Sequence, residues 1–207
     1  MSQEFFQPPG SHAGAWNRQQ LARLEHPDRE RTMPKEPVLA ALAIAPGMHI
    51  ADIGAGVGYF TFPMARVVGT QGQVLAVDLS LAARDEITLR AGHLGLPQIH
   101  ALLCGAERIP IADASVDRIL WHTVYHDLAN LPRAIGESSR ILKPGGRWVI
   151  VDWMKLDTGM GPPLGIRVAR DQAETQLTEQ TGLHVVDRFI PGPVTWGLVM
   201  EKSANAG

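Results

Sequence analysis

One short stretch constrains the fold of this chain more than any other: residues 51–60 read ADIGAGVGYF. An apolar run reaches Asp52, and glycines then follow at alternate positions, Gly54, Gly56 and Gly58. Glycines at this spacing let the backbone turn sharply out of a strand, and they let a ligand approach the main chain without meeting a Cβ atom. The stretch therefore predicts a strand, a ligand-binding glycine loop and a following helix.

Two phosphate-binding motifs compete for this loop, and neither matches. The dinucleotide pattern G-x-G-x-x-G, counted from Gly54, requires a glycine where the chain has Tyr59. A P-loop requires Lys and then Ser or Thr after its last glycine, but Tyr59 and Phe60 follow Gly58. The Asp52 carboxylate would also repel a phosphate placed at the amides of a helix N-terminus. A glycine-rich turn that only connects a strand to a helix is the remaining alternative.

The next apolar run, residues 74–78, also ends in an acid, Asp78. In a βαβ unit, an acid roughly twenty residues beyond the glycine loop accepts hydrogen bonds from the two hydroxyls of an adenosine ribose. The alternative role is to cap the next helix, for which Ser80 is also available. Together with Asp52 and the glycines, Asp78 favours a small ligand that contains adenosine.

Four motifs, in the same order and spacing, resemble those of the class I S-adenosylmethionine-dependent methyltransferases. They are DIGAGVG at residues 52–58, Asp78, VDRIL at residues 116–120 and LKPGGR at residues 142–147. The chain is most similar to the group that includes the ubiquinone and menaquinone C-methyltransferases, and the similarity covers about residues 38–152. It implies a domain that binds S-adenosyl-L-methionine and moves a methyl group to a small-molecule acceptor by in-line displacement.

The resemblance also implies where the cofactor binds. Asp52 and the glycine loop would hold its methionine end, and Asp78 would hold its ribose. The predicted cofactor-binding residues are Asp52, Gly54, Ala55, Gly56, Gly58, Asp78, Leu79, Ala106, Glu107 and His122.

The adenine contact departs from the pattern of the family. Many relatives carry an acid where this chain has Gly105. The contact would therefore pass to a backbone group near Ala106, or to Glu107 or Arg108, with Leu79 as an apolar wall for the ring. A solvated Glu107 on an exposed loop is the alternative.

The segment WHTVYHD, residues 121–127, follows the fourth expected strand. Relatives place the floor of the cofactor site and the mouth of the acceptor site here, so Tyr125 and His126 are the candidate catalytic residues, to orient an acceptor or take its proton. Packing of the same rings on the methionine arm is the alternative. His122 and His126 lack a third ligand on one helical face, and the single cysteine, Cys104, allows no cysteine cluster, so no metal site is predicted.

The remaining pattern predicts an α/β fold, with a Rossmann-like, doubly wound and mostly parallel sheet of about seven strands and a C-terminal antiparallel hairpin. Strands are expected at residues 48–53, 74–77, 99–103, 116–121, 147–151, 183–190 and 194–201. The ligand then belongs at the carboxyl ends of the strands, where the strand order switches. We expect an N-terminal extension over residues 1–37 and the methyltransferase domain over residues 38–207.

The extension should hold one helix near residues 15–25, with Trp16, Leu21 and Leu24 on one face. Such extensions often fold over the cofactor in this family, which would make the segment a lid that closes the site with Trp16 and His12. A helix that only packs on the surface of the domain is the alternative.

The net charge and the hydropathy of the chain restrict the classes of partner that it can bind. The formal net charge is −2 at pH 7, which provides no basic field for a long nucleic acid. Because no apolar run is long enough for a membrane span and the start lacks a signal-peptide pattern, we expect a cytoplasmic protein. We also expect it to be a monomer or a homodimer. Two other functions stay open: a noncatalytic module that binds S-adenosylmethionine or S-adenosylhomocysteine, and a nicotinamide oxidoreductase, which Tyr59 disfavours.

Overall fold

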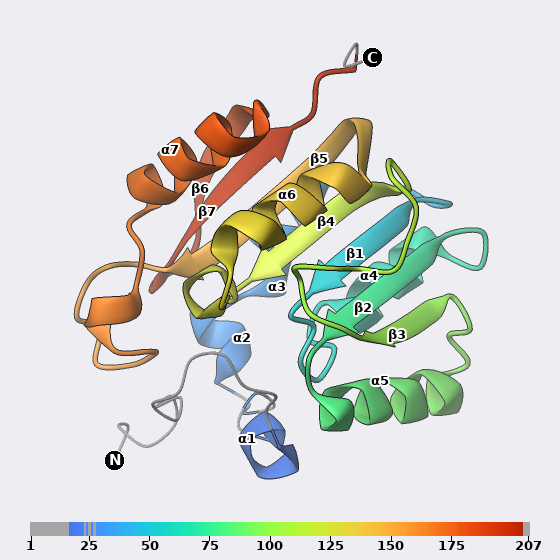
Figure 1. Ribbon diagram of the computed structural model, residues 1–207. Helices are drawn as coiled ribbons and strands as arrows, with labels where there is room; N and C mark the ends of the chain where they lie inside the picture. Colours follow the sequence, from blue (N-terminus) through green and yellow to red (C-terminus); the bar gives the residue numbers. More distant parts are fainter. Residues whose placement is uncertain (1–16, 23, 25, 27, 205–207) are drawn as a thin grey trace.

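A seven-stranded sheet with the order β3-β2-β1-β4-β5-β7-β6 forms the centre of the protein (Figure 1). The computed structural model describes residues 17–22, 24, 26 and 28–204. Its strands are β1 (His49–Ile53), β2 (Gln73–Asp78), β3 (Ile99–Leu103), β4 (Val116–His122), β5 (Leu142–Trp153), β6 (His184–Gly192) and β7 (Thr195–Glu201). The predicted α/β fold and its seven strands are confirmed.

The first five strands pair in parallel, and the last two run as an antiparallel hairpin whose β7 lies beside β5. β5 begins earlier than expected, because the amide of Gly145 and the carbonyl of Gly146 both pair with Lys202. Both glycines therefore belong to the strand, which was expected to begin at residue 147.

Five longer helices cover the two faces of the sheet. They are α3 (Lys35–Leu42), α4 (Thr61–Val68), α5 (Leu81–Leu94), α6 (Leu131–Ile141) and α7 (Arg170–Thr181). Helices α6 and α7 pack on the face that carries Trp121 and Trp148, whereas α3, α4 and α5 pack on the opposite face. Both faces are thus buried, as parallel strands with continuous apolar sequence require. Among the helices of the described ranges, none is long and apolar enough to cross a membrane.

The predicted domain boundary falls inside α3, which begins at Lys35 rather than at residue 38. Pro37 lies in the first turn of this helix, where its missing N–H would have had no partner within the helix. The first three helical residues thus belong to the segment that was expected to be an extension.

The part of the chain before α3 contains two short helices, α1 (Arg18–Ala22) and α2 (Arg29–Thr32), where one was expected. Leu21 and Leu24 do share a contact: both pack in a small cluster with Val57 of the glycine loop. Both helices lie beyond the carboxyl ends of the central strands (Figure 1). Trp16 and His12 lie outside the described residues.

Candidate functional site

The strand order reverses between β1 and β4, and this switch point places the candidate site. β1 pairs with β2 on one side and with β4 on the other. In doubly wound sheets, ligands bind in the crevice that such a reversal opens at the carboxyl ends of the strands. Four polar residues lie at the ends of the strands around this point: Asp52, Asp78, His122 and Asp152.

The glycine loop adopts a backbone that requires glycine. Gly54, Gly56 and Gly58 all have positive φ, at 74°, 54° and 82°. A Cβ atom on Gly54 would lie 2.8 Å from Val124 Cγ2, and one on Gly58 would lie 2.5 Å from Phe62 Cε2. These contacts are too short to be accommodated without movement, so the glycines set both the turn and the close packing of the loop.

Asp78 ties the glycine loop to the second strand. Its Oδ2 accepts the N–H of Gly56 at 2.8 Å, and its Oδ1 accepts the N–H of Ser80 at 2.8 Å. Burial raises the pKa of Asp78, and the backbone hydrogen bonds oppose that rise. Ser80 Oγ caps α5 by accepting the N–H of Ala83, so the alternative capping role belongs to Ser80. Each Asp78 oxygen can still accept a further hydrogen bond.

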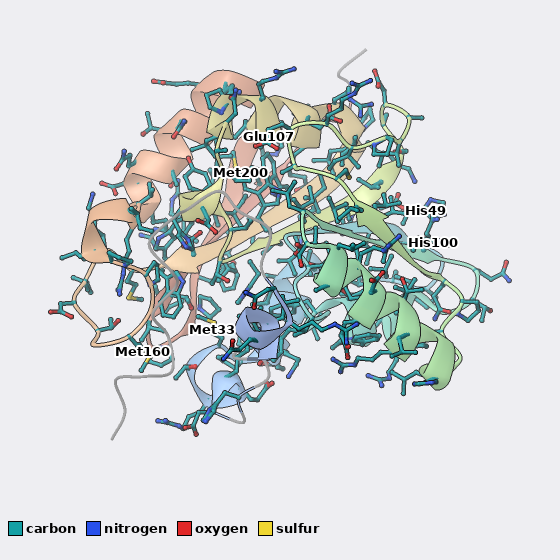
Figure 2. All side chains as sticks on the ribbon, turned by 60° about the horizontal axis from the view of Figure 1, so that its bottom comes forward. Met33, His49, His100, Glu107, Met160 and Met200 are labelled. Atoms are coloured by element: carbon teal, nitrogen blue, oxygen red, sulfur yellow. The ribbon has the colours of Figure 1, made fainter. Side chains whose placement is uncertain are left out.

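Leu79 and Glu107 surround Gly105 at the expected adenine position. The Leu79 side chain is 52% exposed although it is apolar. A Cβ atom on Gly105 would lie 2.5 Å from Glu107 Oε2 and 3.4 Å from Leu79 Cδ2. The Glu107 carboxylate (Figure 2) therefore occupies the space that a side chain on residue 105 would enter. Ala106 is buried beneath this loop.

Asp52 is buried at the end of β1, at 3% exposure, and accepts a hydrogen bond of 2.5 Å from Thr61 Oγ1. Burial raises the pKa of Asp52 to about 6, although the Thr61 hydrogen bond and the nearby Arg29 oppose the rise. The carboxylate therefore lies within the fold beneath the glycine loop, where it can compensate a cation.

His122 ends β4 with its ring against Phe60, at 4.6 Å between the ring centroids. Burial, together with the charge of Arg29, holds the pKa of His122 well below its usual value. The ring is therefore neutral, and it packs against Phe60 at the end of the glycine loop.

The two candidate catalytic residues point to different partners. His126 Nδ1 lies 2.7 Å from Asp152 Oδ1 on β5. Burial lowers the pKa of His126, but the Asp152 charge and hydrogen bond outweigh it, so the pKa is raised overall. Tyr125 is buried in the core, and its hydroxyl donates to Gln176 Oε1 on α7 at 2.9 Å. Both residues lie in or beside the short 3-10 helix η2 (Tyr125–Asp127).

The segment between β5 and α7 folds around a buried arginine, Arg167. Arg167 is buried and donates to the carbonyls of Pro162, Met154 and Leu156 at 2.8, 3.2 and 2.6 Å. This segment includes the 3-10 helix η3 (Leu164–Ile166). Met160 from it packs toward Met33, and the two lie near one another in Figure 2. Arg167 therefore holds the segment together rather than pointing a free charge outward.

Two residues at the site were missed by the sequence analysis as functional candidates. Asp152 ends an apolar run, which is the same signal that identified Asp78. Arg29 lies in a charged segment, RERT, where nothing in the sequence distinguishes it from Arg31. Within the described ranges, no group of three His, Cys, Asp or Glu residues is placed to hold a metal ion.

Comparisons with known proteins agree with the fold that surrounds this site. A family model described as a methyltransferase domain matches residues 51–150. The ubiquinone/menaquinone biosynthesis C-methyltransferase UbiE of Bordetella avium is 29% identical over 157 residues, which cover 68% of this chain and 59% of that protein. The chain thus spans only about three fifths of the length of the curated relatives that it matches, 59% and 62% for the two Bordetella proteins.

Solved structures share the fold over nearly the whole chain. The crystal structure of a SAM dependent methyltransferase from Aquifex aeolicus superposes with a TM-score of 0.83 at 25% identity, and covers 90% of this chain and 98% of that one. The [4+2]-cyclase SpnF superposes with a TM-score of 0.72 at 18% identity, and covers 95% of this chain and 88% of that one.

Proposed function

We propose that this chain is a class I S-adenosylmethionine-dependent methyltransferase and that it transfers a methyl group from S-adenosyl-L-methionine to a small-molecule acceptor. S-adenosyl-L-methionine is the cofactor of that family. One observation of this structure carries the proposal: Asp78 is hydrogen-bonded to Gly56 of the glycine loop at the switch point of the sheet. The loop and the acid that should bind one nucleoside are thereby joined in a single unit.

The predicted cofactor residues fit parts of this ligand. We assign the ribose hydroxyls to Asp78, whose two oxygens each keep a lone pair, and the adenine to the exposed Leu79 and the Glu107 carboxylate. We assign the methionine end to Asp52, Ala55 and the three glycines. His122 would form part of the floor of the cofactor site. The buried Asp52 carboxylate is compatible with the cationic sulfonium of the cofactor. It would repel a phosphate.

The protein supplies position and a proton acceptor. The cofactor provides an electrophilic methyl group on a sulfonium, so holding a nucleophile in line with it can provide roughly 7–11 kcal/mol of rate acceleration. His126 would take the proton of the acceptor on Nε2, because its Nδ1 is committed to Asp152. Asp152 is then a positioning residue that holds the ring and stabilises the imidazolium. A phenol or a carbon acid would profit from this base, whereas a thiolate would not.

The acceptor class rests on the charge of the chain. A formal net charge of −2 favours a small molecule over a long nucleic acid. The cytoplasmic location and the monomeric or homodimeric state stay predictions.

Replacing Asp78 by Ala tests the proposal at its centre. We expect Asp78→Ala to abolish binding of S-adenosylhomocysteine in calorimetry, because the ribose loses its acceptor and the Gly56 amide loses its partner. Asp85→Ala is the matched control, since Asp85 is a solvent-accessible acid on the following helix that pairs with Arg84. Unchanged affinity in Asp78→Ala, with unfolding curves that match the wild type, would refute the assignment.

The fold by itself does not establish methyl transfer, because one architecture hosts many functions. SpnF, whose name is that of a cyclase, shares this fold. Methyl transfer is therefore measured with labelled cofactor against a panel of phenols, carbon acids, amines and thiols. Retained binding with no transfer to any acceptor would favour the noncatalytic binding module.

A further inference from the structure

We propose that Arg29, from the segment before the sheet, binds the carboxylate of the methionine arm and so makes that segment part of the cofactor site. This inference rests on the proposed function, because it names a further contact of the same ligand. Arg29 belongs to α2, which lies at the carboxyl ends of the central strands (Figure 1).

The first observation is a buried guanidinium with unused donors. Arg29 is only 8% exposed, and its Nη1 donates to the carbonyl of Leu24 at 2.9 Å. Its Nε is buried and has no hydrogen-bond partner among the described residues. A buried charged donor without a partner is costly, so such a group indicates an acceptor that a ligand would supply.

The second observation is the way in which Arg29 is held against the glycine loop. Its Cζ lies 4.0 Å from the centroid of the Tyr59 ring, and Lys35 Nζ lies 3.9 Å from the same centroid. The Tyr59 hydroxyl lies 2.8 Å from Glu30 Oε2 and 2.9 Å from the carbonyl oxygen of Met33. Tyr59 directly follows Gly58, so this ring fixes the segment to the end of the loop.

The third observation concerns which acid is available to Arg29. Glu30, its neighbour on α2, pairs instead with Lys35 and with the Tyr59 hydroxyl. Asp52 is close enough for its charge to oppose the drop in the pKa of Arg29 to about 10 that burial causes. The described acids near Arg29 are therefore engaged elsewhere or lie beneath the loop, and no ion pair within the described residues involves its guanidinium.

The chemistry of the ligand matches this arrangement. The methionine arm carries an ammonium group and a carboxylate, so its site needs an anion and a cation close together. Asp52 provides the anion, and Arg29 provides the cation in a planar form that suits a carboxylate. His122 does not compete for this role, because its ring is neutral where it packs against Phe60.

Three ligands distinguish the contribution of the carboxylate to binding from that of the rest of the cofactor. S-adenosylhomocysteine has both charged groups of the arm, decarboxylated S-adenosylhomocysteine lacks only the carboxylate, and 5′-methylthioadenosine lacks both groups. Each is titrated by calorimetry into the full chain and into Arg29→Met, which keeps an apolar stem of similar length in the buried position. Arg31→Met is the matched control on the same helix, because the Arg31 side chain is 74% exposed.

We expect Arg29→Met to lower the affinity for S-adenosylhomocysteine by roughly 10- to 100-fold, because a charge-assisted hydrogen bond to the ligand is lost. Affinity for the decarboxylated ligand and for 5′-methylthioadenosine should change less than about twofold, and Arg31→Met should match the wild type. Arg29→Lys should recover part of the loss, since it restores the charge without the planar fork.

Two outcomes would overturn the inference. One is an unchanged affinity of Arg29→Met for S-adenosylhomocysteine. The other is an equal loss for all three ligands, which would show that Arg29 only supports the fold of the loop. Failure of the wild type to bind any of the three would instead refute the proposed function itself, and that result is distinct from the other two.

Discussion

The loops after β1 and β2 and the loops after β4 and β5 build the two halves of the site in different ways. In the first half, Asp78 is bonded to backbone amides of Gly56 and Ser80. In the second half, His126 is bonded to the side chain of Asp152. Under the proposed function, the cofactor half therefore depends on backbone hydrogen bonds, and the acceptor half depends on a contact between two side chains. Substitutions in the two halves should therefore affect cofactor binding and methyl transfer separately.

The largest effect should come from the acceptor half. We expect His126→Gln to lower kcat by roughly 10²- to 10⁴-fold, because the proton acceptor is lost. Affinity for S-adenosylhomocysteine should stay within about twofold of the wild type, since the residue belongs to the other half. Steady-state kinetics and calorimetry measure the two quantities, and a parallel loss of both would contradict the division into halves.

Asp152→Asn tests whether Asp152 sets the pKa of the His126 ring. In the proposed mechanism the neutral ring accepts the proton, so activity should rise with pH through the pKa of His126. Asp152 raises that pKa, against the effect of burial. Its replacement should therefore move the acidic limb of the pH profile to lower pH as well as reducing kcat, whereas a purely structural role would leave the limb in place.

A smaller effect is expected in the cofactor half, from Asp52→Asn. The folded state holds the proton of Asp52 more tightly than the unfolded chain does, because burial raises its pKa from 3.8 to about 6. Stability from this group is therefore complete below about pH 4 and is lost as the pH rises through 6. At pH 8 the variant should be more stable than the wild type by at most about 3 kcal/mol, and at pH 4 it should be equal.

Urea unfolding at pH 4, 6 and 8 measures this difference without ligand. Asp85→Asn, at a solvent-accessible site, is the control and should show no such trend. A stability gain that does not depend on pH would show that Asp52 is not the titrating group. The same variant should bind S-adenosylhomocysteine more weakly, because the arm loses its anion.

The smallest effect is expected for Tyr125→Phe. The variant loses the hydrogen bond to Gln176, so the free energy of unfolding should fall by about 0.5–1.5 kcal/mol. We expect kcat to be unchanged, because the hydroxyl points to α7 rather than to the His126–Asp152 pair. A fall in kcat of tenfold or more would instead support the catalytic role that the sequence predicts for Tyr125.

Several residues show how much of the candidate site could be predicted from the sequence. The glycine loop, Asp52 and Asp78 were identified because each follows a local rule: an apolar run, a positive φ that glycine tolerates, and a fixed distance along a βαβ unit. Glu107 was named as one of several candidates for the adenine contact, and the structure places its carboxylate beside Gly105. Tyr59 was noticed only as a mismatch, and its role as the anchor of α2 could not be predicted without knowing what packs on it.

By itself, the sequence determined the sheet, the glycine loop and the two acids that flank it, because backbone conformation and burial are encoded in neighbouring residues. The tertiary structure alone decided that Arg29 lies over Tyr59, that His126 meets Asp152, and that Tyr125 turns to Gln176. Each of these contacts joins side chains from separate elements. Their pairing depends on the register and packing of those elements, which local patterns do not specify.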